Sequence, residues 1–238
     1  AHPAGNVGVQ INKLNPINKG EVVWTMNLQD VIALGRFVNK GIVDLTKYVA
    51  LTGPEVYSPC YFKTIVGTNI QPMIAGNVYK ENKLRYIGGN VLSGTKIAEN
   101  GYLGAFDSQI TVIQEGDEAD ELIGWLTPRF NKFSASLSYP WQRFAKFCKC
   151  KFDFDARVLG GRRAIIMSGE YDKVFPMDIL PEQLIKAMIA KNLDQMEALG
   201  AYEVAPEDFA LCEFVCTSKI ETQRIVREAL NYMRKELE

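Results

Sequence analysis

Two different spacings of apolar residues divide this chain of 238 residues. Residues 41–114 hold short β-branched runs between turn residues, which is the pattern of strands. Residues 176–238 instead place apolar side chains about every 3.6 residues, which is the pattern of helices that share a core. Because the strands and most of the helices fall in separate stretches, the sequence predicts an α+β fold.

The first of these stretches predicts a small sheet. Strands are expected at residues 48–52, 61–66, 84–87 and 110–113. A short helix is expected between the second and third strands, with Thr68 as its cap. The order strand, strand, helix, strand, strand fits a β-grasp domain, which we place at residues 41–114.

Residues 1–40 have the pattern of an incomplete α/β unit. A strand-like run at residues 22–26 is followed by Val31, Leu34, Phe37 and Val38 at helical spacing. One strand and one helix make a single step, and an isolated step has no parallel sheet to cover. The chain also begins without an initiator methionine or a signal-like leader, so we expect it to be a fragment of a longer protein.

Residues 115–175 are predicted to connect the sheet to a helical bundle at residues 176–238. The connection starts with an acidic run, continues with a basic and aromatic stretch, and ends with an expected strand pair at residues 163–167 and 173–175. In the bundle, Pro181 suits the first position of a helix. The stretch Ser218-Lys219-Ile220-Glu221 has the pattern of a capping box for the last helix.

The basic and aromatic stretch allows three interpretations. It could stack single-stranded nucleic acid, it could meet anionic lipid or a membrane subunit, or it could be an amphipathic core segment with cations at the surface. The formal net charge of −1 gives no reason to expect nucleic acid, and the core interpretation is the commonest outcome for such a run. For docking on a partner, the candidate residues are Arg129, Lys132, Phe133, Trp141, Arg143 and Lys146.

The sequence assembles no catalytic or metal constellation. The only cysteine pairs are Cys148 with Cys150 and Cys212 with Cys216, and the only histidine is His2, far away in the sequence. A closed zinc site needs four such ligands, so reduced, idle thiols are the simpler interpretation. We therefore predict no catalytic residue and no metal ligand. No stretch reaches about 18 consecutive apolar residues, so the chain is not expected to span a bilayer itself.

One glycine-rich stretch follows the third predicted strand. Gly88, Gly89 and Gly94 could let backbone amides approach a partner or ligand closely. A tight turn explains these glycines equally well, and the full pattern of a phosphate-binding loop is missing. The three glycines are therefore candidates for either role.

Several uncommon stretches occur in one order along the whole chain. They are residues 2–5 and 7–8, 23–25 and 29–31, 49–54, 91–94, 131–134, 176–181, 198–200 and 206–216. Together they resemble the A subunit of the bacterial sodium-pumping NADH:quinone oxidoreductase. The resemblance implies a peripheral subunit on the cytoplasmic side of the bacterial inner membrane, in a complex that couples NADH oxidation and ubiquinone reduction to sodium export.

The same resemblance implies a domain order. Residues 1–40 would end a truncated Rossmann-like domain, residues 41–114 would be a soluble-ligand-binding β-grasp domain, and residues 176–238 would correspond to a cluster-bearing helical bundle. The complex would use NADH, flavins, iron–sulfur clusters and ubiquinone. In the related bundle four cysteines hold the cluster, whereas here only Cys212 and Cys216 are present, so this chain is expected to bind no cofactor.

The leading hypothesis is therefore a redox-silent scaffold that docks on the membrane-embedded subunit of this complex. Ubiquinone is a further candidate partner, to which no residue can be assigned, and nucleic acid is not expected. The alternative is a stand-alone β-grasp module that binds a ligand.

Overall fold

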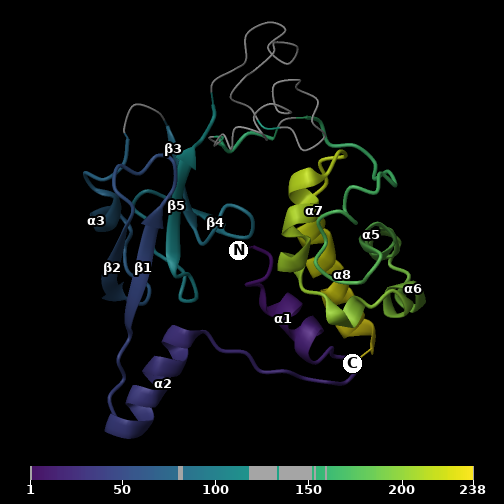
Figure 1. Cartoon of the computed structure of the whole chain (residues 1–238), viewed down its shortest axis with the longest axis horizontal. Coiled ribbons are helices and arrows are strands. Elements are labelled where there is room, and N and C mark those ends of the chain that lie inside the picture. Colours follow the sequence, from purple (N-terminus) through teal and green to yellow (C-terminus); the bar gives the residue numbers. More distant parts are fainter. Residues whose placement is uncertain are drawn as a thin grey trace, which may run out of the picture. The chain divides into compact units, whose positions relative to one another are not determined.

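The computed structural model describes residues 2–79, 83–117, 133, 152, 154–158 and 160–237. Contacts divide the chain into two units. We call Met26–Arg157 the sheet unit, and Ala1–Thr25 together with Val158–Glu238 the helical unit. Every described strand lies in the sheet unit, so the fold is mixed α/β (Figure 1). The predicted domain boundaries at residues 40, 114 and 175 stay predictions.

The sheet unit is built on one five-stranded mixed sheet. Its strands are β1 (Thr46–Thr52), β2 (Cys60–Ile65), β3 (Leu84–Gly88), β4 (Thr95–Ile97) and β5 (Gln109–Gln114), in the order β2-β1-β5-β3-β4. The central pair β1 and β5 is parallel, with Leu51 opposite Ile110, and the other pairs are antiparallel. The four strands predicted from the sequence are thus confirmed, and β4 is an addition.

Burial alternates along β1, whereas residues 110–113 of β5 are all buried, and the sheet unit's core lies on the face of Val49 and Leu51. Val49, Leu51, Ile110 and Val112 are fully buried there, and Ile70 at the start of α3 (Gln71–Ile74) packs with them. The short helix was predicted, but its cap was not. Asn69 rather than Thr68 supplies the side-chain oxygen, which accepts a hydrogen bond from the Gln71 amide at 2.8 Å.

The helical unit consists of short helices around a second core. They are α1 (Val7–Leu14), α5 (Pro181–Ala190), α6 (Leu193–Ala198), the 3₁₀ turns η1 (Ala201–Glu203) and η2 (Pro206–Phe209), α7 (Ala210–Val215) and α8 (Thr222–Leu237). Phe209, Leu184 and Met196 are fully buried at its centre. No helix in the described part of the chain has the length and apolar character that crossing a bilayer requires.

Residues near the start of the chain pack on the far end of it. Val9 of α1 is buried in the helical unit's core, and the Asn12 side chain donates a hydrogen bond to Glu203 at 2.7 Å. Gly8 lies so close to Asp208 that a Cβ atom there would be 2.3 Å from a carboxylate oxygen. The contacts therefore join α1 to the C-terminal helices, and α2 (Leu28–Lys40) to the sheet unit.

Three predicted strands are wrong. Residues 22–26 form no strand, because no other described strand pairs with them. Residues 163–167 run beside the loop before α8, held by one backbone hydrogen bond from Arg163 to Ser218 and by the Ser218 hydroxyl on the Ala164 carbonyl. Residues 173–175 belong to a turn in which the Phe175 amide donates to the Tyr171 carbonyl, and this turn buries both rings in the core.

The predicted capping box at Ser218–Glu221 is also wrong. Helix α8 begins at Thr222, and the carboxylate of Glu213 in α7 accepts a hydrogen bond from the Gln223 amide at 3.0 Å. Ser218 lies four residues before the first residue of α8, and its hydroxyl donates to the Ala164 carbonyl. The prediction that Pro181 begins a helix is confirmed.

Candidate functional site

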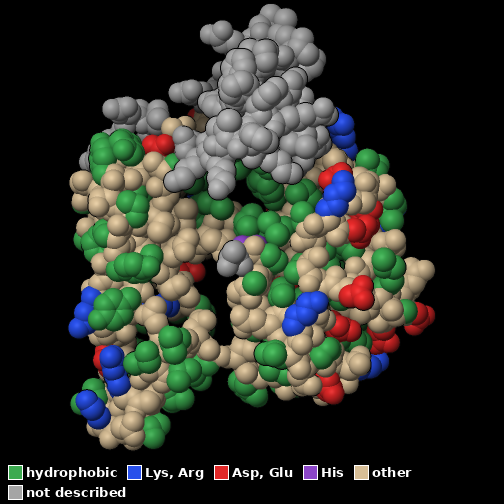
Figure 2. Space-filling view, in the orientation of Figure 1, with side chains coloured by type: hydrophobic (Ala, Val, Ile, Leu, Met, Phe, Trp, Pro, Cys, Tyr) green, Lys and Arg blue, Asp and Glu red, His purple; other side chains and the backbone are tan. Residues whose placement is uncertain are grey.

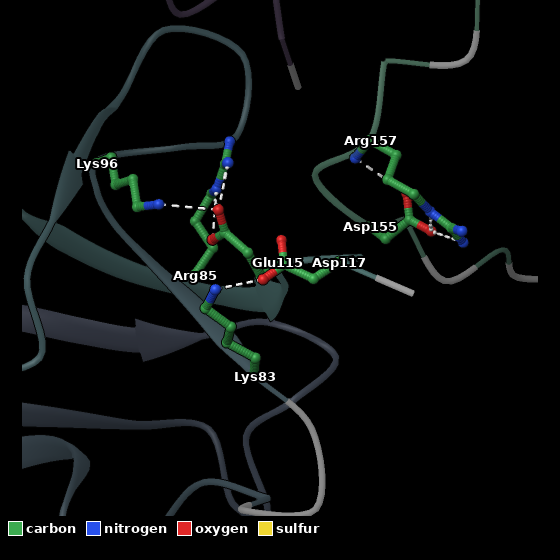
Figure 3. A network of polar contacts seen from close by, with 7 residues as sticks. All are labelled: Lys83, Arg85, Lys96, Glu115, Asp117, Asp155 and Arg157. Carbon is green, nitrogen blue, oxygen red and sulfur yellow. Dashed lines mark hydrogen bonds and ion pairs between the residues drawn. The ribbon is translucent and has the colours of Figure 1, made fainter. Parts of the chain in front are cut away.

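The most strongly charged cluster in the described residues lies where β5 ends. Glu115 accepts two hydrogen bonds from the Arg85 guanidinium, at 2.9 and 2.7 Å, and one from the Lys96 ammonium at 2.8 Å (Figure 3). Lys83 pairs with Asp117 beside them. Arg85 comes from β3 and Lys96 from β4, so the cluster ties three neighbouring strands together at one end of the sheet.

The Glu115 carboxylate is held ionised by these neighbours. Hydrogen bonds from Arg85 and then from Lys96 lower its pKa from 4.5 to about 2. Two cations around one anion leave a positive balance at this corner of the sheet. The arrangement can bind and orient charged groups, but it holds no nucleophile or proton donor that works near neutral pH.

A second ion pair, between Arg157 and Asp155, lies beside the same end of β5. Arg157 donates to the Asp155 carboxylate at 2.9 and 2.6 Å, and the Ala156 amide donates to the Gln114 carbonyl at 3.0 Å (Figure 3). Residues 114–117 and residues 155–157 are thus fixed at one end of β5. The basic and aromatic stretch lies between these two anchors in the sequence.

Most of the predicted docking residues lie outside the described part of the chain. These are Arg129, Lys132, Trp141, Arg143 and Lys146. Phe133 is described, and its ring packs edge-on against Phe152 and Phe154, with centroids 5.7 Å apart in both pairs. Such packing is what the core interpretation expects of this aromatic residue. Docking through the six residues stays a prediction.

The glycine-rich stretch forms a turn that closes on its own backbone. Gly89 has a φ of 92°, which favours glycine, and a Cβ on Gly94 would be 2.5 Å from the Asn90 and Gly88 carbonyl oxygens. A Cβ on Gly88 would be 2.5 Å from a carboxylate oxygen of Asp107. The turn's own packing therefore accounts for all three glycines, and a ligand there stays untested.

The two described cysteines of the helical unit are buried thiols. Cys212 and Cys216 lie in the core, and the Tyr171 hydroxyl donates to the Cys216 sulfur at 2.9 Å. Burial raises the pKa of Cys212 to about 12, so its thiolate form is disfavoured. Two such thiols do not fit a four-iron cluster, and the described residues contain no group of three potential metal ligands. Cys148 and Cys150 lie outside the described residues.

Sequence reasoning missed Arg85 and Lys96 as members of the charged cluster. Glu115 was noted only as the start of an acidic run. The partners come from other strands, and Lys96 lies in β4, which was not predicted. The available signal was Thr95-Lys96-Ile97, a short polar and apolar alternation directly after the glycine turn, which is typical of the second strand of a hairpin.

Two protein-family models match this chain. One is described as the NqrA second alpha/beta domain and matches residues 1–43, and the other is described as the NQRA C-terminal domain and matches residues 48–99. These matches define a class, namely multidomain subunits in which an α/β domain is followed by the domain that contains this sheet.

Within that class, full-chain similarity identifies one family. The chain is 41% identical over 236 residues to the A subunit of the Na(+)-translocating NADH-quinone reductase of Rhodopirellula baltica, and 39% and 40% identical to those of Pasteurella multocida and Serratia proteamaculans. The alignments cover 99% of this chain and 51–52% of the relatives, so the chain spans about half their length. The chain belongs to the family of these A subunits.

The similarity extends well beyond the sheet unit. Because it also covers the helical unit at both ends of the sequence, it does not favour a stand-alone β-grasp module.

Proposed function

We propose that this chain works as part of the peripheral A subunit of a sodium-pumping NADH:quinone oxidoreductase. The observation that carries the proposal is identity of about 40% over 99% of the chain to relatives that bear this name. In this function the whole complex couples NADH oxidation and ubiquinone reduction to sodium export. Its place is on the cytoplasmic side of the bacterial inner membrane, where the other subunits of the complex are its partners.

The proposed role of this chain in the complex is that of a scaffold. The charged cluster around Glu115 lacks a group for electron or proton chemistry, and the buried thiols of Cys212 and Cys216 do not form a cluster site. NADH, flavins, iron–sulfur clusters and ubiquinone are accordingly proposed to react on other parts of the complex. Ubiquinone remains a candidate partner of this chain without an assigned residue.

The proposed domain assignments follow from the strand order. Order β2-β1-β5-β3-β4 with a parallel central pair, and a helix between β2 and β3, supports a β-grasp domain at residues 41–114. The match to an α/β domain model supports residues 1–40 as the end of a Rossmann-like domain. The short helices of residues 176–238 around one core support a small bundle.

Activity of the assembled complex tests the proposed function. Membranes from a host whose own gene for the A subunit is deleted are compared with membranes complemented by the full-length gene that encodes this chain. Complementation is expected to restore sodium-stimulated, NADH-dependent quinone reduction, and the encoded protein is expected to co-purify with the other subunits. Co-purification without sodium-stimulated activity, or no co-purification, would contradict the proposal.

A second experiment tests the docking segment within the same complex. Reversal of Arg129, Lys132, Arg143 and Lys146 to Glu is expected to reduce recovery of the membrane-embedded subunit in a pull-down about tenfold or more. The matched control reverses four exposed lysines elsewhere, namely Lys13, Lys63, Lys186 and Lys235. Equal recovery from both variants would remove this segment as the docking site and leave membership of the complex intact.

A further inference from the structure

Helix α2 carries an apolar stripe that nothing in the sheet unit covers. Its members are Leu28, Val31, Leu34 and Val38, spaced by three or four residues. Leu28 is 76% exposed and Val38 is 73% exposed, and none of the thirteen residues of α2 is buried. Figure 2 shows hydrophobic side chains at the surface over this helix. Contiguous exposed apolar surface of this kind marks an interaction site.

The polar side of the same helix is the side that holds it in place. The Gln29 side-chain amide donates to the Tyr48 carbonyl at 3.1 Å and accepts from the Tyr48 amide at 2.8 Å. One turn from the end of the helix, Arg36 donates to the Asp44 carboxylate at 2.6 Å. Residues seven apart lie on one side of a helix, so Gln29 and Arg36 together face β1 and the segment before it.

The Gln29 hydrogen bonds satisfy backbone groups of Tyr48 that have no partner in β5. In β1 only Ala50, Leu51 and Thr52 are paired with β5, so Tyr48 lies beyond the end of that ladder. The Gln29 amide takes the place of a missing strand partner there. The helix is therefore turned the opposite way from an ordinary surface helix, with polar groups toward its own unit and apolar groups away from it.

A glycine on the apolar stripe points to close packing by a partner. Gly35 lies seven residues after Leu28 and three before Val38, so it belongs to the same side of α2. A Cβ atom at Gly35 would meet nothing within 4 Å, so no contact in the described residues requires glycine there. A glycine inside a helix lowers the helix's stability. A common structural reason for one is that a neighbouring backbone or side chain packs close to the helix at that point.

We propose that the apolar stripe of α2 packs on the sheet of the α/β domain, in the half of the longer subunit that this chain does not span. This rests on the proposed function, because it assumes that the chain works within a full-length A subunit. Residues 1–43 match an α/β domain model, yet the described residues 2–43 contain helices and no strand. The sheet that such a helix covers must therefore come from elsewhere in the longer protein, and about half of the relatives' length is available for it.

In this arrangement α2 is a two-sided joint. Its polar side is fixed to β1 by Gln29 and Arg36, and its apolar side is fixed to the neighbouring domain. The run Val22-Val23-Trp24-Thr25-Met26, directly before α2 in the sequence, fits the same partner. Trp24 is 93% exposed, and no hydrogen bond in the described structure involves the backbone of these five residues. Both features suit an extended segment that contacts another domain.

Cysteine labelling of α2 tests the joint in the full-length subunit. Val31→Cys lies on the stripe, and Lys40→Cys lies about 180° around the helix from it, while both native side chains are exposed. Each variant is made in the 238-residue chain and in the full-length subunit. Labelling with a maleimide is followed peptide by peptide, so that the native cysteines do not interfere. Circular dichroism confirms that each variant is folded.

The expected result is protection of the stripe in the full-length subunit only. Val31→Cys should react about tenfold or more slowly there than in the 238-residue chain, whereas Lys40→Cys should change by no more than about twofold. Equal rates for Val31→Cys in both proteins would overturn the proposal. Slow labelling of Val31→Cys in the 238-residue chain alone would also overturn the proposal. If that protection increased with protein concentration, a second copy of the chain would cover the stripe. If it did not, the chain's own helical unit would cover it.

The remaining outcomes separate the inference from the proposed function. Protection that needs the assembled complex, and is missing in the isolated full-length subunit, would assign the stripe to a different subunit, which would overturn the joint. Loss of co-purification and activity with the unmodified subunit would instead contradict the proposed function. A full-length subunit that assembles and is active, but reacts freely at Val31→Cys, would contradict the joint alone.

Discussion

The sheet unit and the helical unit differ in which polar side chains they bury completely. Among the largest fully buried side chains, those of the sheet unit are all apolar, for example Leu51 and Ile110. In the helical unit the corresponding group includes Glu182 and Thr222. The sheet unit's strongest ion pairs, around Glu115, lie at the end of a strand instead.

The difference follows from how each unit satisfies its backbone. A sheet pairs its amides and carbonyls along the ladder, so few backbone groups need a side chain, and in the sheet unit the nearly buried Lys47 and Thr111 donate to the Ala105 and Gly89 carbonyls. Short helices have many ends, and each end leaves backbone groups without a partner. In the helical unit, buried side chains bond backbone groups both at such ends and in the loops between helices. Glu182 accepts hydrogen bonds from the Ser168 and Gly169 amides, and the Thr222 hydroxyl donates to the Phe209 carbonyl.

The two units are expected to have separate hydrophobic cores. Truncating one large side chain in each core tests whether a change in one core affects the other. Phe209→Ala removes a fully buried ring that packs on Phe175 with centroids 4.7 Å apart, and should cost about 3–5 kcal/mol. Leu51→Ala in the sheet unit should cost about 2–5 kcal/mol. Peptide-resolved hydrogen exchange should show lost protection in the altered unit only. Lost protection in both units after either change would contradict separate cores.

The glycine-rich turn of the sheet unit packs so closely that it should not accept a side chain at Gly94. Gly94→Ala would place a Cβ 2.5 Å from two backbone carbonyl oxygens, and should lower the free energy of unfolding by about 1–3 kcal/mol. The control is Gly161→Ala in the helical unit, where a Cβ would meet nothing within 4 Å and the change should stay within about 0.5 kcal/mol. Urea unfolding measures both. Equal stability of the two variants would show that the turn can open without cost.

Acid should sharpen the contrast, because one carboxyl group in each unit responds with the opposite sign. The pKa of Glu115 is lowered to about 2, so its stabilisation is present above about pH 4.5 and is lost as the pH falls toward 2. Burial raises the pKa of Asp208, so its ionisation opposes folding, and the helical unit is favoured while this group stays protonated.

Glu115→Gln isolates the sheet unit's part of this response. The variant should lose about 1–2 kcal/mol at neutral pH, since Arg85 and Lys96 lose their charged partner. Its stability should then fall less steeply than that of the unmodified chain between pH 5 and about pH 2.5. Urea unfolding over that range provides the measurement. Parallel pH profiles for the two proteins would mean that Glu115 does not titrate as the ion pairs require.

Local patterns predicted the sheet unit better than the helical unit's details. Short β-branched runs bounded by turn residues were enough to find β1 and β5, because such residues favour strands. The cap of α8 could not be found in this way, since Glu213 belongs to another helix and meets the Gln223 amide only in the folded unit. The charged cluster could not be predicted for the same reason, because Arg85 and Glu115 lie thirty residues apart in the sequence.

The smallest expected change in stability is a gain and not a loss. It concerns α2, the helix whose apolar side chains neither core buries. Helix α5 buries Leu184, Ile185 and Met188, and α8 buries Val226, Ala229 and Met233, whereas α2 has no buried residue. Gly35→Ala should therefore stabilise the 238-residue chain by about 0.5–1 kcal/mol, because alanine favours the helix and the added methyl group meets open space. In the full-length subunit the same methyl group would press on the sheet that we propose covers this side, so the gain should vanish or become a loss. Thermal unfolding of both proteins, with and without the substitution, measures the difference. An equal gain in both would mean that no backbone or side chain approaches Gly35 closely, and the exposed stripe of α2 would then need another explanation.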